Sequence, residues 1–373
     1  MSEAIRAITM PKWGLAMEEG QVIAWHVEEG AEIKAGDELV DIETSKITNV
    51  YESPVGGILR RRVVAEGETL PVGALIGVVS DAGLPDAEVD AFVERFNAAF
   101  AEKLAARTEA GGPAPQTVSA EGRQINYLEM GAGDGPPLLL IHGFGGDLNN
   151  WLFNQPALAE SQRVIALDLP GHGRSSKEIG GGGLDELSRT LGAFLDALAI
   201  ERAHLAGHSM GGALALLYAL QRPERVASLS LLAPAGLGPD VNMDFIEGFI
   251  GAGRRKEMKA VLQLLVADPE LVSRDMVEDV LKFKRLDGVE PALRRLADSL
   301  FPGGRQQTIP AEELGRLAVP ALVIWGRLDQ ILPPTQSELL PEGVALHLLE
   351  GIGHMPHMEA ANEVNRLIAA QVA

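Results

Sequence analysis

The sequence contains no cysteine and no long hydrophobic run. The absence of cysteine excludes disulfides, thiolate metal sites and a cysteine nucleophile, so any thioester chemistry must use a substrate or a prosthetic group. No stretch approaches the roughly 18 consecutive apolar residues of a membrane span. The N-terminus also lacks a charged-then-apolar signal pattern, and we expect a cytoplasmic protein. A formal charge of −20 argues against nucleic-acid binding, which needs a concentrated basic patch.

The chain of 373 residues has room for about two or three domains. We expect a small domain over residues 1–82, a helix and Gly/Pro linker over 83–116, and a larger domain over 117–373. Apolar residues at helical spacing predict the helix at 86–107. This helix either docks a partner or covers the following domain, and we favour the second interpretation. The linker then reads EAGGPAPQ at 109–116.

The first part of the chain repeats itself. Adding 37 to a residue number in one arm gives its counterpart in the other, as with Gly30 and Gly67. Apolar residues recur at near-alternate positions with glycine at the turns, which predicts two small interlocked β-sheets. Between the copies, the polar stretch DIETSKITN at 41–49 must turn one half into the other. A hairpin at this place would hold Lys46 in solvent.

This arrangement resembles the lipoyl domain of 2-oxo-acid and acetoin dehydrogenase complexes, whose modified lysine follows Glu-Thr-Asp or Glu-Thr-Ser at such a tip. The resemblance covers residues 4 to about 80, including MPKWG at 10–14 and SPVGG at 53–57. It implies a lipoate attached covalently to Lys46. The biotin carrier shares the fold but flanks its lysine with methionine, whereas serine and isoleucine flank Lys46. The lysine carrier of the glycine-cleavage system is a weaker alternative. The remaining alternative is that Lys46 is an unmodified lysine on the protein surface.

In the second part, short continuous apolar runs alternate with helical patterns. This alternation predicts a parallel sheet covered by helices on both faces. The apolar runs begin at Leu138, Val164, His204, Ser228, Leu322 and Ala345. Residues from about 240 to 312 break the alternation because they are helical with no strand pattern. We therefore expect a helical cap over the carboxyl edge of the sheet, where ligands bind in open α/β folds.

One strand-to-helix turn reads GHSMG at 207–211, with Ser209 at its centre. Glycines flank a serine in this way at a nucleophile elbow, a tight turn that exposes the hydroxyl and aims a helix N-terminus at it. A second glycine-rich segment, HGFGG at 142–146, follows an earlier strand. There the backbone N–H of Phe144 could pair with that of Met210 as an oxyanion hole.

Two later residues complete the pattern, since Asp329 follows a strand and His354 follows the last strand. The order Ser, Asp, His resembles the triad of α/β-hydrolases. This resemblance covers residues 117 to 373, with DLPGHGRS at 168–175 as a further landmark and no departure at the triad positions. It implies that Ser209 attacks an acyl carbon, His354 transfers the proton and Asp329 orients the imidazole.

Four further polar residues of these loops are expected to support them rather than to do chemistry. They are His142, Asp168, His172 and His208. Each triad residue has a structural interpretation as well, because a serine between glycines is often only a turn and an aspartate after a strand is often a helix cap.

As a whole, the chain is similar to the dihydrolipoamide acetyltransferase component of bacterial acetoin cleavage systems, which combines these two domains. No histidine is followed by three residues and Asp-Gly, the motif of the ordinary acyltransferase component of such complexes. The resemblance implies a thiamine-diphosphate partner enzyme that cleaves acetoin and loads acetyl onto the lipoyl group of Lys46. It also implies coenzyme A as co-substrate and a flavin-dependent dihydrolipoamide dehydrogenase as second partner.

The mechanism that we favour from the sequence is a ping-pong transfer, in which Ser209 accepts acetyl from the dihydrolipoyl thioester and coenzyme A removes it. A second hypothesis is an ester or thioester hydrolase with an appended lipoyl carrier domain. A third is a lipoyl carrier whose hydrolase fold is only a scaffold. The sequence leaves a homo-oligomer open.

Overall fold

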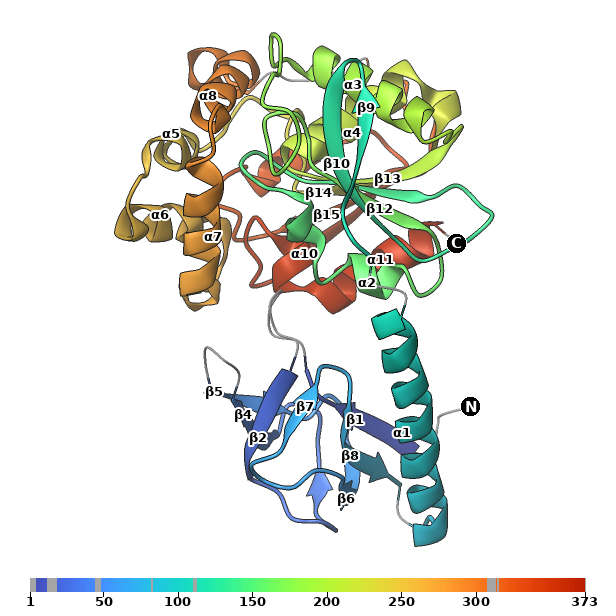
Figure 1. The fold of residues 1–373 in the computed structure, drawn as a ribbon. Coiled ribbons are helices and arrows are strands. Elements are labelled where there is room, and N and C mark those ends of the chain that lie inside the picture. Colours follow the sequence, from blue (N-terminus) through green and yellow to red (C-terminus); the bar gives the residue numbers. More distant parts are fainter. Residues whose placement is uncertain are drawn as a thin grey trace. The chain divides into compact units, whose positions relative to one another are not determined.

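The chain forms two compact units, Met1–Gly112 and Pro113–Ala373, in a computed structural model (Figure 1). The structure describes residues 5–11, 19–43, 48–81, 83–109, 113–306, 313 and 315–372. Lys46 lies outside the described residues. No helix in the described ranges is both long and apolar enough to cross a membrane.

The first unit consists of two four-stranded sheets with the orders β1-β8-β6-β3 and β5-β4-β2-β7. The strands are β1 (Ile5–Thr9), β2 (Glu19–Trp25), β3 (Glu32–Ile33), β4 (Glu38–Glu43), β5 (Thr48–Glu52), β6 (Gly57–Arg62), β7 (Thr69–Pro71) and β8 (Leu75–Ser80). Adding 37 to the residue numbers of β2, β3 and β4 gives β6, β7 and β8 to within one residue. Gly30 and Gly67 share a left-handed backbone, with φ of +89° and +88°. The predicted pair of interlocked sheets is therefore confirmed.

An apolar core fills the first unit, and a hairpin stands at one edge of it. The core residues include Ile8, Val22, Leu39, Ile42, Leu59, Ile76 and Val79. Strands β4 and β5 pair antiparallel with Glu43 opposite Thr48, so they form a hairpin whose two strands lie on either side of Lys46 in the sequence. The residues that join the two strands, 44–47, are outside the described ranges.

Helix α1 (Asp86–Glu109) packs on the first unit. Val89 is fully buried in a small cluster with Leu75 of β8, and Arg60 of β6 pairs with Asp86 in the first turn of the helix. The described part of this helix is therefore a cover for the preceding sheet. The interpretation as a cover for the following domain stays a prediction, and the packing on β8 was not anticipated, because an apolar stripe does not specify which neighbour it packs against.

The second unit contains an eight-stranded sheet in the order β16-β15-β14-β13-β11-β12-β10-β9. Its strands are β9 (Gln116–Ala120), β10 (Arg123–Met130), β11 (Leu138–Ile141), β12 (Val164–Leu167), β13 (Ala203–His208), β14 (Val226–Leu232), β15 (Ala321–Gly326) and β16 (Ala345–Leu349). The six strands from β11 onward are parallel, as predicted, whereas β9 and β10 add an antiparallel edge that was not expected from the sequence.

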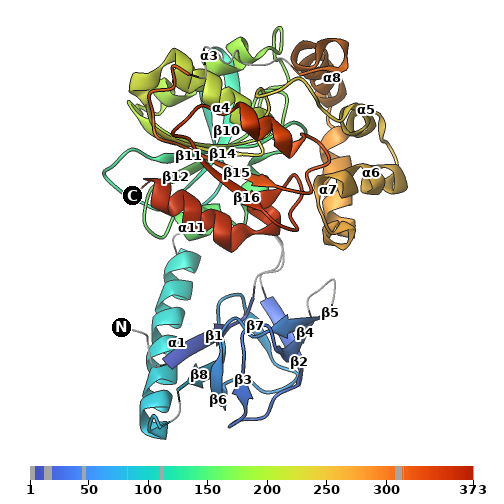
Figure 2. The ribbon, with the colours of Figure 1, turned by 180° about the vertical axis from the view of Figure 1, so that it is seen from behind.

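Helices cover both faces of this sheet (Figure 2). Along β11, Leu139 and Ile141 pack toward α3 (Leu184–Ala197) and α4 (Met210–Gln221). The alternate residues of β11 pack on the other side. That side is covered by α2 (Gln155–Leu158), α10 (Pro356–Glu359) and α11 (Ala361–Val372).

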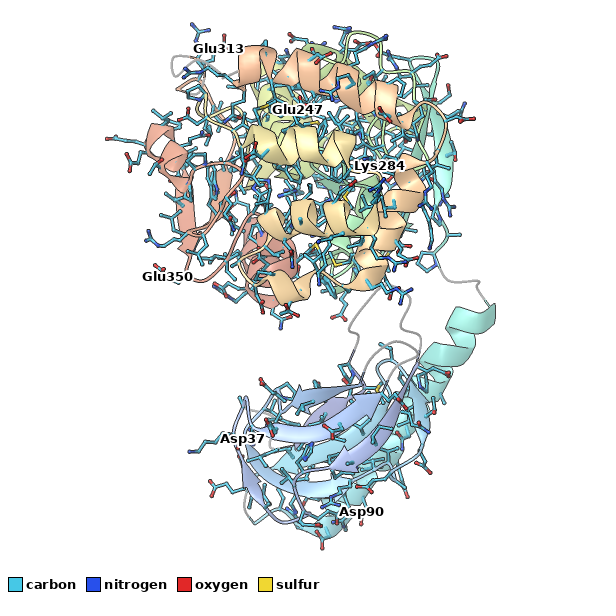
Figure 3. All side chains as sticks on the ribbon, turned by 90° about the vertical axis from the view of Figure 1, so that its left-hand side faces the viewer. Asp37, Asp90, Glu247, Lys284, Glu313 and Glu350 are labelled. Atoms are coloured by element: carbon cyan, nitrogen blue, oxygen red, sulfur yellow. The ribbon has the colours of Figure 1, made fainter. Side chains whose placement is uncertain are left out.

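Four helices between β14 and β15 form a layer of their own, which is the expected helical cap. They are α5 (Met243–Gly251), α6 (Arg255–Leu262), α7 (Arg274–Lys284) and α8 (Val289–Leu300), joined in part by short 3-10 turns. Figure 3 shows them side by side, with Glu247 of α5 and Lys284 of α7 labelled; Glu247 is exposed, whereas Nζ of Lys284 donates to the carbonyl of Ile250. The described residues from 241 to 306 contain no strand.

Candidate active site

Ser209 stands at the turn between β13 and α4 in a strained backbone conformation, with φ of +52° and ψ of −116°. Such a conformation costs a side-chain-bearing residue about 1–3 kcal/mol and needs close packing to hold it. A Cβ atom on Gly207 would meet the carbonyl oxygen of Gly211 at 2.3 Å, and one on Gly211 would meet that of Ile141 at 2.4 Å. Only glycine fits at both places, and the turn has the geometry of a nucleophile elbow.

His354 and Asp329 form a buried pair, with 2.7 Å between His354 Nδ1 and Asp329 Oδ2. The same carboxylate accepts hydrogen bonds from Trp325 Nε1 at 2.8 Å and from the N–H of Ile331 at 2.7 Å. These donors fix the carboxylate plane, so Nδ1 of His354 carries its proton toward Asp329 and Nε2 is left as the base. The contact from Trp325 was not anticipated from the sequence.

The hydroxyl of Ser209 forms no hydrogen bond with any residue in the described ranges, so the structure does not join Ser209 directly to His354. The two are close through His208, the residue before Ser209, whose ring centroid lies 4.8 Å from that of His354. In enzymes without substrate, catalytic hydrogen bonds are often long and shorten only in the reacting complex. The elbow and the pair of His354 and Asp329 are thus adjacent, but no hydrogen bond joins Oγ of Ser209 to Nε2 of His354.

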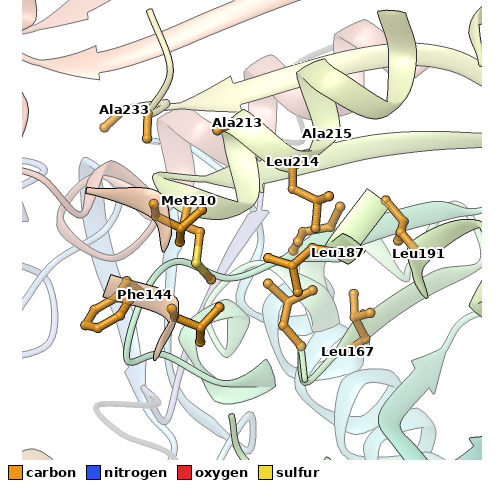
Figure 4. Packing of buried hydrophobic residues seen from close by; sticks show 14 of the residues in the cluster. Phe144, Leu167, Leu187, Leu191, Met210, Ala213, Leu214, Ala215 and Ala233 are labelled. Carbon is orange, nitrogen blue, oxygen red and sulfur yellow. The ribbon is translucent and has the colours of Figure 1, made fainter. Parts of the chain in front are cut away.

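The two residues predicted to form an oxyanion hole, Phe144 and Met210, lie in the loop after β11 and in the elbow itself. A Cβ atom on Gly143 would come 3.1 Å from Cβ of Ser209, which places the loop at 143–146 in contact with the serine. Neither the N–H of Phe144 nor that of Met210 donates a hydrogen bond to any residue that the structure describes. Two unpaired N–H groups at the elbow are what an oxyanion requires. Both side chains lie at one end of the buried cluster in Figure 4.

Aromatic side chains of the cap region also contact the loop at 143–146. The ring of Phe144 makes edge-to-face contacts with Phe249 of α5 at 6.2 Å and with Phe301 after α8 at 6.3 Å. A Cβ atom on Gly145 would meet the ring of Phe249 at 2.5 Å, so that ring packs directly on the loop backbone. These contacts with the cap could not be read from the sequence, because they join residues more than a hundred positions apart.

Two buried histidines fix the backbone of the loops. The N–H of Leu169 donates to His142 Nε2 at 2.9 Å, and the N–H of Gly145 donates to His172 Nε2 at 3.1 Å. Each ring directs Nδ1 at a backbone carbonyl oxygen, at 2.7 and 3.1 Å. A ring that accepts at one nitrogen and donates at the other is neutral, and burial lowers the pKa of both histidines. Their contacts agree with the supporting role that the sequence predicts.

Asp168 is buried and accepts three hydrogen bonds. The donors are the N–H of Leu148, the N–H of Arg174 and the amide of Asn126, each at 2.8 Å. It ties the loop after β12 to the loop after β11, which is a structural role. Nearby, burial raises the pKa of Asp147 to about 6, and the charge of Asp168 adds to that rise.

Comparisons with known proteins agree with both units. Residues 136–361 match the family model described as alpha/beta hydrolase fold, and residues 6–79 match the one described as biotin-requiring enzyme. A solved meta-cleavage product hydrolase from Pseudomonas fluorescens has a TM-score of 0.63 and 29% sequence identity, and the match covers 69% of this chain and 96% of that one.

Similarity over nearly the whole chain is found with two curated proteins. Both are described as the dihydrolipoyllysine-residue acetyltransferase component of an acetoin cleaving system. The protein from Pseudomonas putida is 52% identical over 366 residues, which cover 98% of each chain. The protein from Cupriavidus necator is 45% identical over 368 residues, which cover 99% of this chain and 97% of that one. With both domains matched, the chain belongs to the dihydrolipoyllysine-residue acetyltransferase components of acetoin cleaving systems, a family of enzymes that join a lipoyl domain to an α/β-hydrolase fold.

Proposed function

We propose that this enzyme moves acetyl from a lipoyl thioester on Lys46 to coenzyme A through an acyl-enzyme at Ser209. The observation that carries the proposal is the buried pair of His354 and Asp329 beside the Ser209 elbow, in a chain that also contains a lipoyl domain. Acyl transfer by a serine needs such a pair, because an unassisted hydroxyl is a poor nucleophile near neutral pH.

Lys46 fits the attachment of lipoate because the hairpin strands β4 and β5 flank it and a packed apolar core supports them. The attached group would supply the thiol that presents acetyl as a thioester. Peptide mass spectrometry on protein from a host given lipoate tests this assignment, with Lys34 of the same unit as the internal control. We expect the adduct on Lys46, and an adduct on Lys12 or Lys34 instead would exclude it.

In the first half of the reaction, Oγ of Ser209 attacks the thioester carbonyl while its proton passes to Nε2 of His354. The carbonyl oxygen becomes an anion beside the N–H groups of Phe144 and Met210, which stabilise it. Asp329 keeps the proton of His354 on Nδ1 throughout. When the carbon–sulfur bond breaks, the leaving thiolate takes the proton from Nε2, and an acetyl ester of Ser209 remains.

The second half reverses these roles with coenzyme A. Its thiol gives a proton to Nε2 of His354, and the thiolate sulfur attacks the acetyl carbon of the ester. As the ester bond breaks, Oγ of Ser209 takes the proton back. The products are acetyl-coenzyme A and the free serine, so protons and electrons balance without an oxidant.

Hydrolysis is the second candidate, because the solved relative is described as a hydrolase. The experiment follows acetyl loaded on the carrier of the wild-type protein, with and without coenzyme A, and measures both acetate and acetyl-coenzyme A. We expect acetyl-coenzyme A with the co-substrate and slow loss of acetyl without it. Rapid release of acetate without coenzyme A would instead make this a hydrolase with a carrier attached.

The same proposal includes partners and a location. An acetoin-cleaving enzyme with thiamine diphosphate would load the carrier, and a dihydrolipoamide dehydrogenase would reoxidise the dithiol. The proposed use of coenzyme A fits the cytoplasmic location that the sequence predicts. Reconstitution of acetoin cleavage from the three purified proteins tests the set, and activity that persists when either partner is omitted would remove that partner from it.

A further inference from the structure

His208 contacts all three catalytic segments at once. It precedes Ser209 in the chain, and its Nε2 lies 2.8 Å from the carbonyl oxygen of His354. A Cβ atom on Gly143 would come 2.9 Å from Nδ1 of His208, so the oxyanion loop packs on the same ring. The side chain is buried. Neither half of the proposed transfer uses this ring to bind substrate or to carry a proton.

The hydrogen bond from His208 is the link between the base and the nucleophile strand. A carbonyl oxygen only accepts, so Nε2 of His208 carries the proton and donates it. His354 is also held at its N–H by the carbonyl of Leu265 at 2.9 Å and at its ring by Asp329. Of these three bonds, only the one from His208 comes from β13, the strand that ends at His208 next to Ser209.

The ring of His208 is also packed from behind. His357 lies 4.6 Å from it and Trp151 lies 4.7 Å from His357, measured between ring centroids. Burial lowers the pKa of His208 well below its usual value and that of His357 to about 3. Both rings are therefore neutral at neutral pH, and they do not repel the imidazolium that forms on His354 during transfer.

We propose that His208 is a positioning residue, which sets the separation between the Ser209 hydroxyl and the ring of His354 by holding the backbone of His354. This inference rests on the proposed role of Ser209 as nucleophile. A misplacement of about 1 Å in a catalytic geometry costs on the order of 10²-fold in rate. Loss of the donor should therefore lower kcat and leave the KM of a small substrate nearly unchanged.

The test uses the full chain and three variants. His208→Phe keeps a ring but removes the donor, His208→Gln places an amide N–H near the position of Nε2, and His208→Asn places it near Nδ1, too short to reach the carbonyl. His204 of the same strand, whose Nδ1 bonds Ser228 at 2.7 Å, provides the control substitution His204→Phe. The readouts are kcat and KM with p-nitrophenyl acetate and the rate of labelling of Ser209 by a fluorophosphonate.

We expect the Phe and Asn variants to lose about 10²-fold in kcat and in labelling rate. The Gln variant should recover to within about tenfold of wild type, since its amide restores the donor. The control should stay within about twofold, because a lost bond outside the site does not alter transition-state binding. Thermal unfolding of each variant is measured in parallel, and if the Phe variant does not fold, the contrast between Gln and Asn decides.

Wild-type rates in a folded Phe or Asn variant would overturn the positioning role. A Gln variant as slow as the Asn variant would overturn it equally, because the donor would then be irrelevant. Failure of the Ser209 assignment would give a different result. If the fluorophosphonate does not label Ser209 in the wild-type protein, Ser209 is not the nucleophile. The two failures are thus distinguishable.

Discussion

The two units bury different kinds of side chain. Among its described residues, the first unit buries only two polar side chains, Ser53 and Ser80. The second unit buries five histidines and two aspartates, namely His142, His172, His208, His354, His357, Asp168 and Asp329. A carrier needs only a stable apolar core beneath an exposed hairpin. A catalyst must hold polar groups away from water at fixed distances, which costs desolvation free energy. All of these side chains except His357 have a hydrogen-bond partner among the described residues, which offsets that cost.

The largest effects are expected when one functional residue is removed from each unit, which tests whether the first unit is the carrier and the second the catalyst. Ser209→Ala should abolish transfer to coenzyme A, with a loss on the order of 10⁶ in turnover, because removal of a triad nucleophile removes the covalent route. Lys46→Arg should abolish loading of the carrier but leave fluorophosphonate labelling of Ser209 at the wild-type rate. Acetyl loading is measured by intact mass and transfer by formation of acetyl-coenzyme A.

The remaining triad residues give graded losses in the same assay. His354→Ala should behave like Ser209→Ala, and Asp329→Asn should cost about 10⁴, since it leaves the histidine in the wrong tautomer. A drop of only several-fold in Ser209→Ala would contradict the covalent mechanism. Full activity of the complex with any of these variants would make the hydrolase fold a scaffold for the carrier.

The second prediction concerns acid, which should destabilise the two units unequally. The folded-state pKa of His357, about 3, lies below the value of about 6.5 in an unfolded chain. The unfolded state therefore binds more protons between these two pH values. The contribution of His357 to the free energy of unfolding is present in full above pH 6.5 and is lost as the pH falls toward 3. From pH 7 to 5 the loss is about 2 kcal/mol for this histidine. The lowered pKa values of His142, His172 and His208 act in the same direction.

Asp147 acts in the opposite direction. Its folded-state pKa, about 6, lies above that of an unfolded aspartate, so protonation of this group favours the folded state by about 1 kcal/mol at pH 5. Calorimetry of the full chain at pH 7 and pH 5 should show that the free energy of unfolding falls more for the second unit than for the first. His357→Phe should reduce that fall by about 2 kcal/mol. Equal falls in both transitions would refute the prediction.

The third prediction concerns the stability of the first unit, where α1 packs on β8. Val89→Ala removes two buried methyl groups between α1 and β8 and should lower the unfolding free energy of the first unit by about 2 kcal/mol. The transition of the second unit should not move. Glu94→Ala, an exposed change on the same helix, is the matched control and should alter stability by less than about 0.5 kcal/mol. A shift of the second transition instead would show that α1 stabilises the other unit.

The smallest effect is expected at the surface of the cap. Residues 241–311 of the cap contain eleven acidic and eleven basic residues, although the chain as a whole has a formal net charge of −20, so basic residues are concentrated in this segment. On the N-terminal side of α6, Arg254 and Lys256 form no ion pair within the described residues, whereas Arg255 pairs with Glu278. These cations would attract the phosphates of coenzyme A.

Neutralising Arg254, Arg255 and Lys256 to glutamine should raise the KM for coenzyme A about two- to fivefold with little change in kcat, and high salt should remove the difference. Arg222→Gln with Arg316→Gln, two exposed cations elsewhere in the second unit, serves as the control. If both variants keep the wild-type KM at low salt, the cations of α6 form an ordinary solvated surface.

Much of the fold could be predicted because two patterns in the sequence are local. The 37-residue repeat reports the symmetry of two sheets, and the glycines around Ser209 report a turn that no larger residue fits. The antiparallel strand β10 was missed, since its sequence RQINYLEM mixes polar with apolar residues and does not form a continuous apolar run.

The inner geometry of the candidate site could not be predicted in the same way. The bond from His208 to His354 joins residues 146 positions apart, and the rings of Phe144 and Phe249 meet only once the cap is folded over the sheet. Spacing within the sequence predicts which residues do chemistry. It does not identify the neighbours that hold them, because those are chosen by packing between distant segments.

The strand order of the first unit has a mechanical consequence. The first and last strands of this unit, β1 and β8, pair with each other from Ile5 opposite Ser80 onward. They lie in the sheet that does not contain β4 and β5. A pull that reaches β8 through α1 acts first on the ladders between β8 and its neighbours β1 and β6, and neither neighbour belongs to the hairpin that flanks Lys46.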